Sequence, residues 1–155
     1  MEARDLTVVP PRRWSESLGG ITWLPRLIDK ARAALQGTLG AYLYGQSPMD
    51  RGLLRQLGLS HRELAVIVKN AADDEAVLAA LIARDPEAVE RARRWTAAEL
   101  PDRHRLFLYL MDFDDGYLGG WTLSMKKIAN AGSGVFTALV KRAMPSNAIA
   151  RAREE

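Results

Sequence analysis

Hydrophobic residues in this chain recur at intervals of three and four positions, the spacing that places side chains on one face of an α-helix. The clearest such stretch runs from residue 24 to residue 36, and its apolar members are Leu24, Leu27, Ile28, Ala31, Ala34 and Leu35. Further helical stretches are expected over 48–57, 64–70, 74–84, 86–98, 122–130 and 135–144. The pattern predicts an all-α fold, a compact single-domain bundle of about seven or eight short helices.

Several of these stretches are bounded by residues that satisfy the unpaired backbone groups of helix termini. Ser47 is of a residue type favoured at the N-cap. It is followed by Pro48, and proline suits the first helical position. Ser60 and Glu63 have the spacing of a capping box, and Gly58 offers a left-handed end to the preceding helix. These signals predict where helices begin and end.

The first twenty residues lack a helical pattern and carry two turn-forming pairs, Pro10-Pro11 and Gly19-Gly20. We expect an extended arm that lies across the body and is pinned by Trp14 and Leu18, with a frayed tail as the alternative. The predicted organisation is an arm over 1–20, a helical domain over 21–145 and a charged C-terminal end over 146–155.

One stretch, residues 105–111, is ambiguous between strand and helix. Its composition, with Phe107 and Tyr109 among leucines, is compatible with a strand. A helix is favoured because no second strand is expected that could pair with it.

The face of residues 24–36 opposite the apolar stripe is charged, and two interpretations remain open. In the first, this face is solvated, and Asp29 bridges Arg26 and Arg32, each three residues away. In the second, the charged face borders a groove with an aromatic rim, where cations hold an anionic group and rings supply apolar contact. The candidate ligand-binding residues are Trp23, Arg26, Asp29, Lys30, Tyr42, Tyr44 and Asp50.

This part of the chain also resembles a known family. The run GITWLPRLIDKARA (residues 20–33), followed by Leu35, Gly37, Gly40, Tyr42, Tyr44, Pro48 and Asp50, resembles the bacterial domain-of-unknown-function family 5069 (DUF5069). The resemblance begins near residues 5–7, is dense to about residue 50 and then thins. It implies no particular activity or substrate. The family pattern has a cysteine where this chain has Ser47, which argues against thiol chemistry at this turn.

Composition excludes several classes of protein. The chain of 155 residues contains no cysteine, which removes disulfides and thiolate chemistry and fits a reducing cytoplasm. It lacks both a secretory signal pattern and an apolar run of the roughly 20 residues that a membrane span needs. The net charge of +3 is scattered among acidic residues, so neither nucleic acid nor an acidic membrane surface is a favoured partner.

The sequence gives little support for a metal site or a bound cofactor. Aspartates 112, 114 and 115 suggest calcium, but counting an EF-hand loop from Asp112 places Tyr117 and Leu123 where glycine and glutamate belong. The two histidines, His61 and His104, would need carboxylates to complete a zinc site. We therefore expect no metal and no cofactor.

The leading functional hypothesis is a non-enzymatic module that binds a small anionic ligand or a protein partner. Whether the chain is an enzyme stays open, and that alternative would use Asp29, Asp50 or Asp112 as a general base on a small molecule. A weak nucleic-acid binder is a further alternative, since the chain carries a surplus of basic residues. A helix-turn-helix is disfavoured because residues 64–68 are apolar, whereas a recognition helix needs polar side chains.

Overall fold

The computed structural model describes residues 3–100, 108–112 and 115–117 of the chain. The chain separates into two units, Met1–Leu108 and Tyr109–Glu155, of which the first holds all the elements below. Its elements are β1 (Ser17–Leu18), β2 (Ile21–Thr22), α1 (Leu24–Gln36), α2 (Pro48–Leu57), α3 (His61–Asn70), α4 (Asp74–Arg84), α5 (Pro86–Arg94) and the π-helix η1 (Trp95–Glu99). The predominance of short helices confirms the predicted fold class.

The helices begin and end where the local signals predicted. The hydroxyl of Ser47 accepts a hydrogen bond from the amide of Asp50 at the start of α2. Ser60 and Glu63 form both hydrogen bonds of a capping box at the start of α3. Gly58 ends α2 in the left-handed conformation, with φ of 63°.

Two elements of the structure differ from the elements that the sequence predicted. A two-stranded antiparallel hairpin, with Ser17 opposite Thr22 and Leu18 opposite Ile21, precedes α1. The α5 helix was expected to continue to residue 98, but it changes into η1 at Trp95.

Residues 108–112 are helical, which confirms helix over strand for the described part of 105–111. The expected helices over 122–130 and 135–144 lie outside the described residues.

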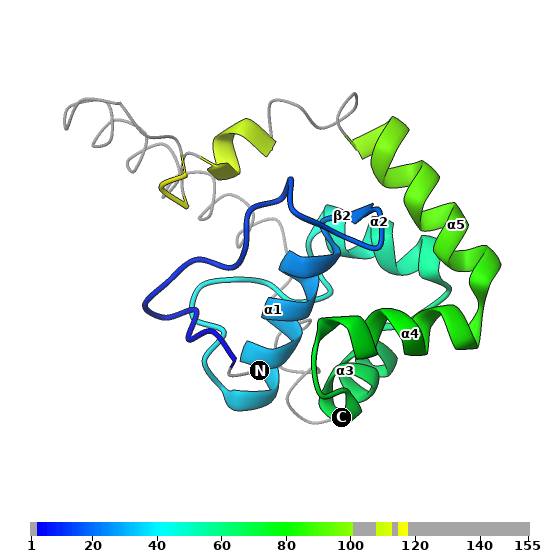
Figure 1. Cartoon of the computed structure of the whole chain (residues 1–155). Helices are drawn as coiled ribbons and strands as arrows, with labels where there is room; N and C mark the ends of the chain where they lie inside the picture. Colours follow the sequence, from blue (N-terminus) through cyan, green and yellow to red (C-terminus); the bar gives the residue numbers. More distant parts are fainter. Residues whose placement is uncertain (1–2, 101–107, 113–114, 118–155) are drawn as a thin grey trace. The chain divides into compact units, whose positions relative to one another are not determined.

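Helix α1 occupies the centre of the first unit (Figure 1). It packs against α3 and β1, while α5 packs against α2, α4, η1 and β2. Ten consecutive residues, Leu24 to Ala33, are buried, so the helix is enclosed on every side over this part of its length. The expectation of a solvated charged face is therefore wrong. The end of the predicted apolar stripe is instead exposed, since Leu35 keeps 47% of its surface accessible.

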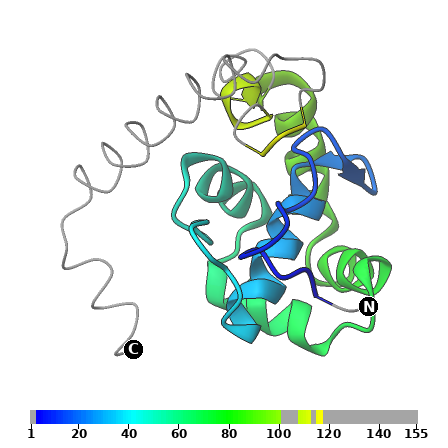
Figure 2. The ribbon, with the colours of Figure 1, turned by 90° about the vertical axis from the view of Figure 1, so that its left-hand side faces the viewer.

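The N-terminal arm is one of the segments that enclose α1, and Figure 2 shows it lying along this helix. Over residues 3–16 it contains turns but no helix or strand. Leu6 and Pro11 are buried, and the amide of Leu6 donates to the carbonyl of Thr38. Leu18 is buried as expected, and Trp14 is half-buried, with its main-chain carbonyl accepting a hydrogen bond from the amide of Trp23.

The α3 and α4 helices pack together and leave some apolar side chains in solvent. Ile82 of α4 is 39% exposed, and Val66 of α3 is 58% exposed. In the described part of the chain, each helix is too short or too polar to cross a bilayer.

Candidate functional site

The charged side chains of α1 lie inside the protein, surrounded by other buried and half-buried polar and aromatic residues. We call this set the α1 polar cluster, and it comprises Arg12, Trp23, Arg26, Asp29, Lys30, Arg32, Tyr42, Tyr44, Asp50 and Asp74. Burying a charge is costly unless the charge is paired and hydrogen-bonded. The arrangement of this cluster therefore decides both the stability and the chemistry of the region.

Asp50 is completely buried in the first turn of α2 and accepts hydrogen bonds from three directions. The ammonium of Lys30 donates to Oδ1 at 2.5 Å and to Oδ2 at 2.6 Å. The indole N–H of Trp23 donates to Oδ1 at 3.0 Å, and the amide of Gly45 donates to Oδ2 at 3.0 Å. Because both oxygens are already hydrogen-bonded, this carboxylate is poorly suited to act as a general base.

Arg12 reaches from the arm to two carboxylates on different helices. It donates to Asp29 of α1 through its main-chain amide and its guanidinium, at 2.8 to 3.1 Å. It also donates to Asp74 of α4 at 2.5 Å, and Arg32 lies 2.6 Å from the other oxygen of Asp74. The cluster thus ties the arm, α1 and α4 together.

These contacts shift the protonation equilibria of the linked groups. Burial alone would lower the pKa of Arg12, but hydrogen bonds and charge from Asp29 and Asp74 outweigh it and raise the pKa. Burial alone would raise the pKa of Asp74, but Arg12 and Arg32 outweigh it and lower the pKa. Both groups are held in their charged forms at neutral pH.

Arg26 lies between aromatic rings at the edge of the same cluster. Its guanidinium carbon is 5.4 Å from the ring centroid of Trp23 and 5.7 Å from that of Tyr42. Such distances allow attraction between the cation and both ring faces. One guanidinium nitrogen donates to the main-chain carbonyls of Pro11 at 3.4 Å and Arg12 at 3.0 Å.

Tyr44 secures the loop between α1 and α2. Its hydroxyl donates to the carbonyl of His61 at 2.6 Å, and its ring meets the imidazole of His61 edge-on. Burial, followed by the negative charge of Asp50, raises the pKa of Tyr44 well above its usual range. The phenol therefore stays protonated and acts as a hydrogen-bond donor.

The structure brings the seven sequence-predicted residues into one neighbourhood, but each is engaged by groups of the protein itself. Sequence reasoning missed Arg12 and Asp74. Their contacts join positions separated by 17 and 62 residues, and no spacing rule covers such distances along the chain. Asp112, the third candidate for a general base, is buried and belongs to the second unit. Among the described residues, no three histidine or acidic side chains converge as they would around a metal ion.

Comparison with known sequences places this architecture in a family. The profile of a domain of unknown function, DUF5069, matches residues 8–106. The match spans α1 to α5 and every residue of the α1 polar cluster. No curated protein matches the chain. Since the profile covers well over half of its length, the chain belongs to the DUF5069 family.

Proposed function

We propose that this protein is a non-enzymatic binding module that takes a small anionic ligand at Arg26. The observation that carries the proposal is the position of this guanidinium between Trp23 and Tyr42, where it donates to carbonyls of the arm. An anionic oxygen makes a stronger hydrogen bond to a guanidinium than a neutral carbonyl does. A ligand of this kind could therefore replace the carbonyls of Pro11 and Arg12 by displacing the arm.

The other predicted site residues have supporting roles in this proposal. Lys30 and Asp50 hold the Trp23 ring in place, and Tyr44 holds the loop that carries Tyr42. Asp29 retains the arm through Arg12. The arm has neither helix nor strand over residues 3–16, and its carbonyls occupy Arg26, so it is the segment that must move to admit a ligand.

Backbone strain supports a site at this position. Trp23 has a φ of 73°, and within the described residues it is the one non-glycine residue with a positive value. Left-handed conformations of large residues persist where their surroundings enforce them, and they are concentrated at ligand-binding and active sites. The strained residue supplies one of the two rings that contact Arg26.

An enzymatic role is less well supported, because Asp29 and Asp50 are already engaged by cations.

The absence of cysteine from the sequence supports the accompanying proposal of a cytoplasmic location.

The proposal is tested by titrating phosphate and citrate into the protein while following the indole N–H resonance of Trp23 by NMR. We expect this resonance to shift and saturate, and the melting temperature to rise, because ligand binding to the folded state stabilises it. Arg26→Gln should abolish both responses, whereas Arg84→Gln, an exposed arginine on α4, should leave them unchanged.

A second variant, Tyr42→Leu, tests the site if Arg26→Gln does not fold. Tyr42→Leu keeps the guanidinium but removes one ring, and it should weaken binding of the same anions. Saturable binding that is unaffected by Tyr42→Leu and Arg26→Gln, or no response of wild-type protein to either anion, would overturn the proposed site.

A further inference from the structure

Four arginines on α2 and α5 are not part of the α1 polar cluster. We call Arg51 and Arg55 of α2, with Arg91 and Arg94 of α5, the arginine face. All four are exposed. Arginines in solvent on two adjacent helices form a charged surface whose use is not explained by the fold.

The packing of α2 on α5 shows why these side chains belong to one surface. The two helices are in contact, and a Cβ atom added at Gly52 would lie 2.6 Å from the ring of Trp95. Arg51 precedes Gly52, and Arg55 follows one helical turn later. Arg91 lies one turn before Trp95, so it projects on the side of α5 that faces α2.

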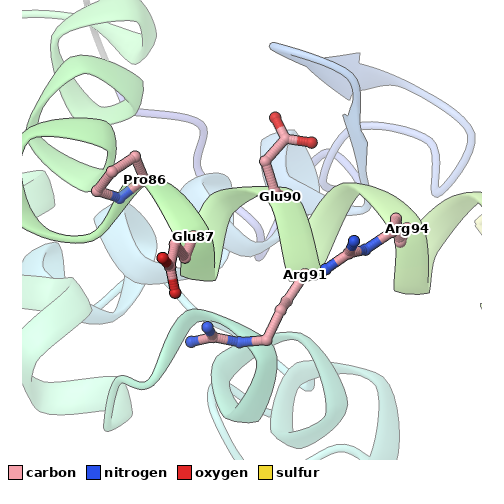
Figure 3. Close-up of a pocket in the computed structure, with 5 residues that line it drawn as sticks. All are labelled: Pro86, Glu87, Glu90, Arg91 and Arg94. Carbon is pink, nitrogen blue, oxygen red and sulfur yellow. The ribbon is translucent and has the colours of Figure 1, made fainter.

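The two acidic residues of α5, Glu87 and Glu90, lie on the same side of the helix as Arg94. Figure 3 shows Glu90 and Arg91 projecting from opposite sides of the helix. Glu90 pairs with Arg93, which also donates to the carbonyl of Gly19 in the hairpin. Arg91 lies 3.5 Å from Asp85, an exposed pair that contributes little stability. The only acidic residue of α2 is Asp50, which is buried and already engaged.

The surface of α5 is also hollowed. An open depression of about 480 Å³ is lined by Pro86, Glu87, Glu90, Arg91 and Arg94 (Figure 3). Its lining therefore mixes cations with carboxylates, whereas the adjoining surface of α2 presents Arg51 and Arg55. A complementary surface would be mainly acidic, with a basic group opposite Glu87.

We propose that the arginine face docks an acidic segment of a partner protein. The planar guanidinium pairs with carboxylates through two parallel hydrogen bonds, and arginine is enriched at protein interfaces. A nucleic acid presents a uniform row of phosphates, which Glu87 and Glu90 would repel at the depression. This proposal does not depend on anion binding at Arg26, since the two surfaces share no residue.

Fluorescence anisotropy with a labelled glutamate-rich peptide tests the docking surface. We expect saturable binding to the full chain at low salt, and a loss of about tenfold or more in affinity for R51E/R55E, because repulsion replaces two attractive contacts. The matched control is K69E/R84E, which makes the same change in charge at exposed positions of α3 and α4. It should change the affinity by no more than about twofold, because exposed charges at a distance are screened.

Three outcomes would overturn the proposal: no binding of the peptide to wild-type protein, equal losses in the variant and its control, or tighter binding of a short duplex DNA than of the peptide. Circular dichroism melts check that the variants are folded. If R51E/R55E is unfolded, R51Q/R55Q removes the charges without reversing them and must still weaken binding.

Discussion

The indole N–H of Trp23 donates a hydrogen bond of 3.0 Å to Oδ1 of Asp50, and this bond joins the start of α1 to the first turn of α2. The same carboxylate holds Lys30 and the amide of Gly45. One buried aspartate therefore fixes two helices and the loop between them. It also helps to hold Trp23 in its left-handed conformation.

Replacing Trp23 with phenylalanine should lower the free energy of unfolding by about 1.5–3 kcal/mol, since a hydrogen bond to a charged acceptor is lost inside the protein. The aromatic ring against Arg26 and Lys30 is retained in this variant. Urea denaturation of both proteins measures the difference. Unchanged stability would show that the hydrogen bond contributes nothing net.

Replacing Lys30 with methionine should be more damaging, with a loss of about 3–5 kcal/mol, because Asp50 is left buried without its cation. Removing both charges with Lys30→Met and Asp50→Asn should cost less than the sum of the single changes. Chemical denaturation of the four proteins gives the coupling energy. Strict additivity would contradict a direct interaction between the two side chains.

Two glycines with positive φ allow the stability cost of overpacking to be measured separately from the cost of backbone strain. Gly45 has a φ of 72°, and a Cβ atom there would lie 2.4 Å from Cβ of His61. Gly58 has a φ of 63° and nothing within 4 Å of such an atom. Gly58→Ala should cost about 1–2 kcal/mol through backbone strain alone. Gly45→Ala should cost about 1–3 kcal/mol more through overpacking, and thermal melts of both variants test the order.

The contacts of Asp74 should make stability depend on pH. Because Arg12 and Arg32 lower its pKa in the folded state below the ordinary 3.8, its contribution is present above that value and is lost as the pH falls through the folded pKa. Asp74→Asn should therefore be less stable than wild type at pH 7, and the gap should narrow below about pH 4.

Urea denaturation from neutral to acidic pH measures this gap, with Glu75→Gln as a control that removes a neighbouring exposed carboxylate. A gap for Asp74→Asn that stays constant across the whole range would contradict the ionic role of Asp74.

The positions of helices could be predicted from the sequence because their signals are local. A hydroxyl at Ser60 and a carboxylate at Glu63 satisfy backbone groups within the same turn, whatever the rest of the chain does. The glycine at 58 ends a helix for an equally local reason. The pattern of residues 23–50 left two interpretations open, and the gathering of Trp23, Arg26 and Lys30 near Asp50 belonged to only one of them.

What only the tertiary structure decided is the environment of that pattern. The charged side of α1 has the spacing of a solvated helix face, yet the arm and the loop before α2 cover it. Arg12 and Asp74 supply charges that make this burial tolerable, and they meet across 62 residues of chain. Periodicity records which residues share a face of a helix, but burial depends on which distant segments pack against that face.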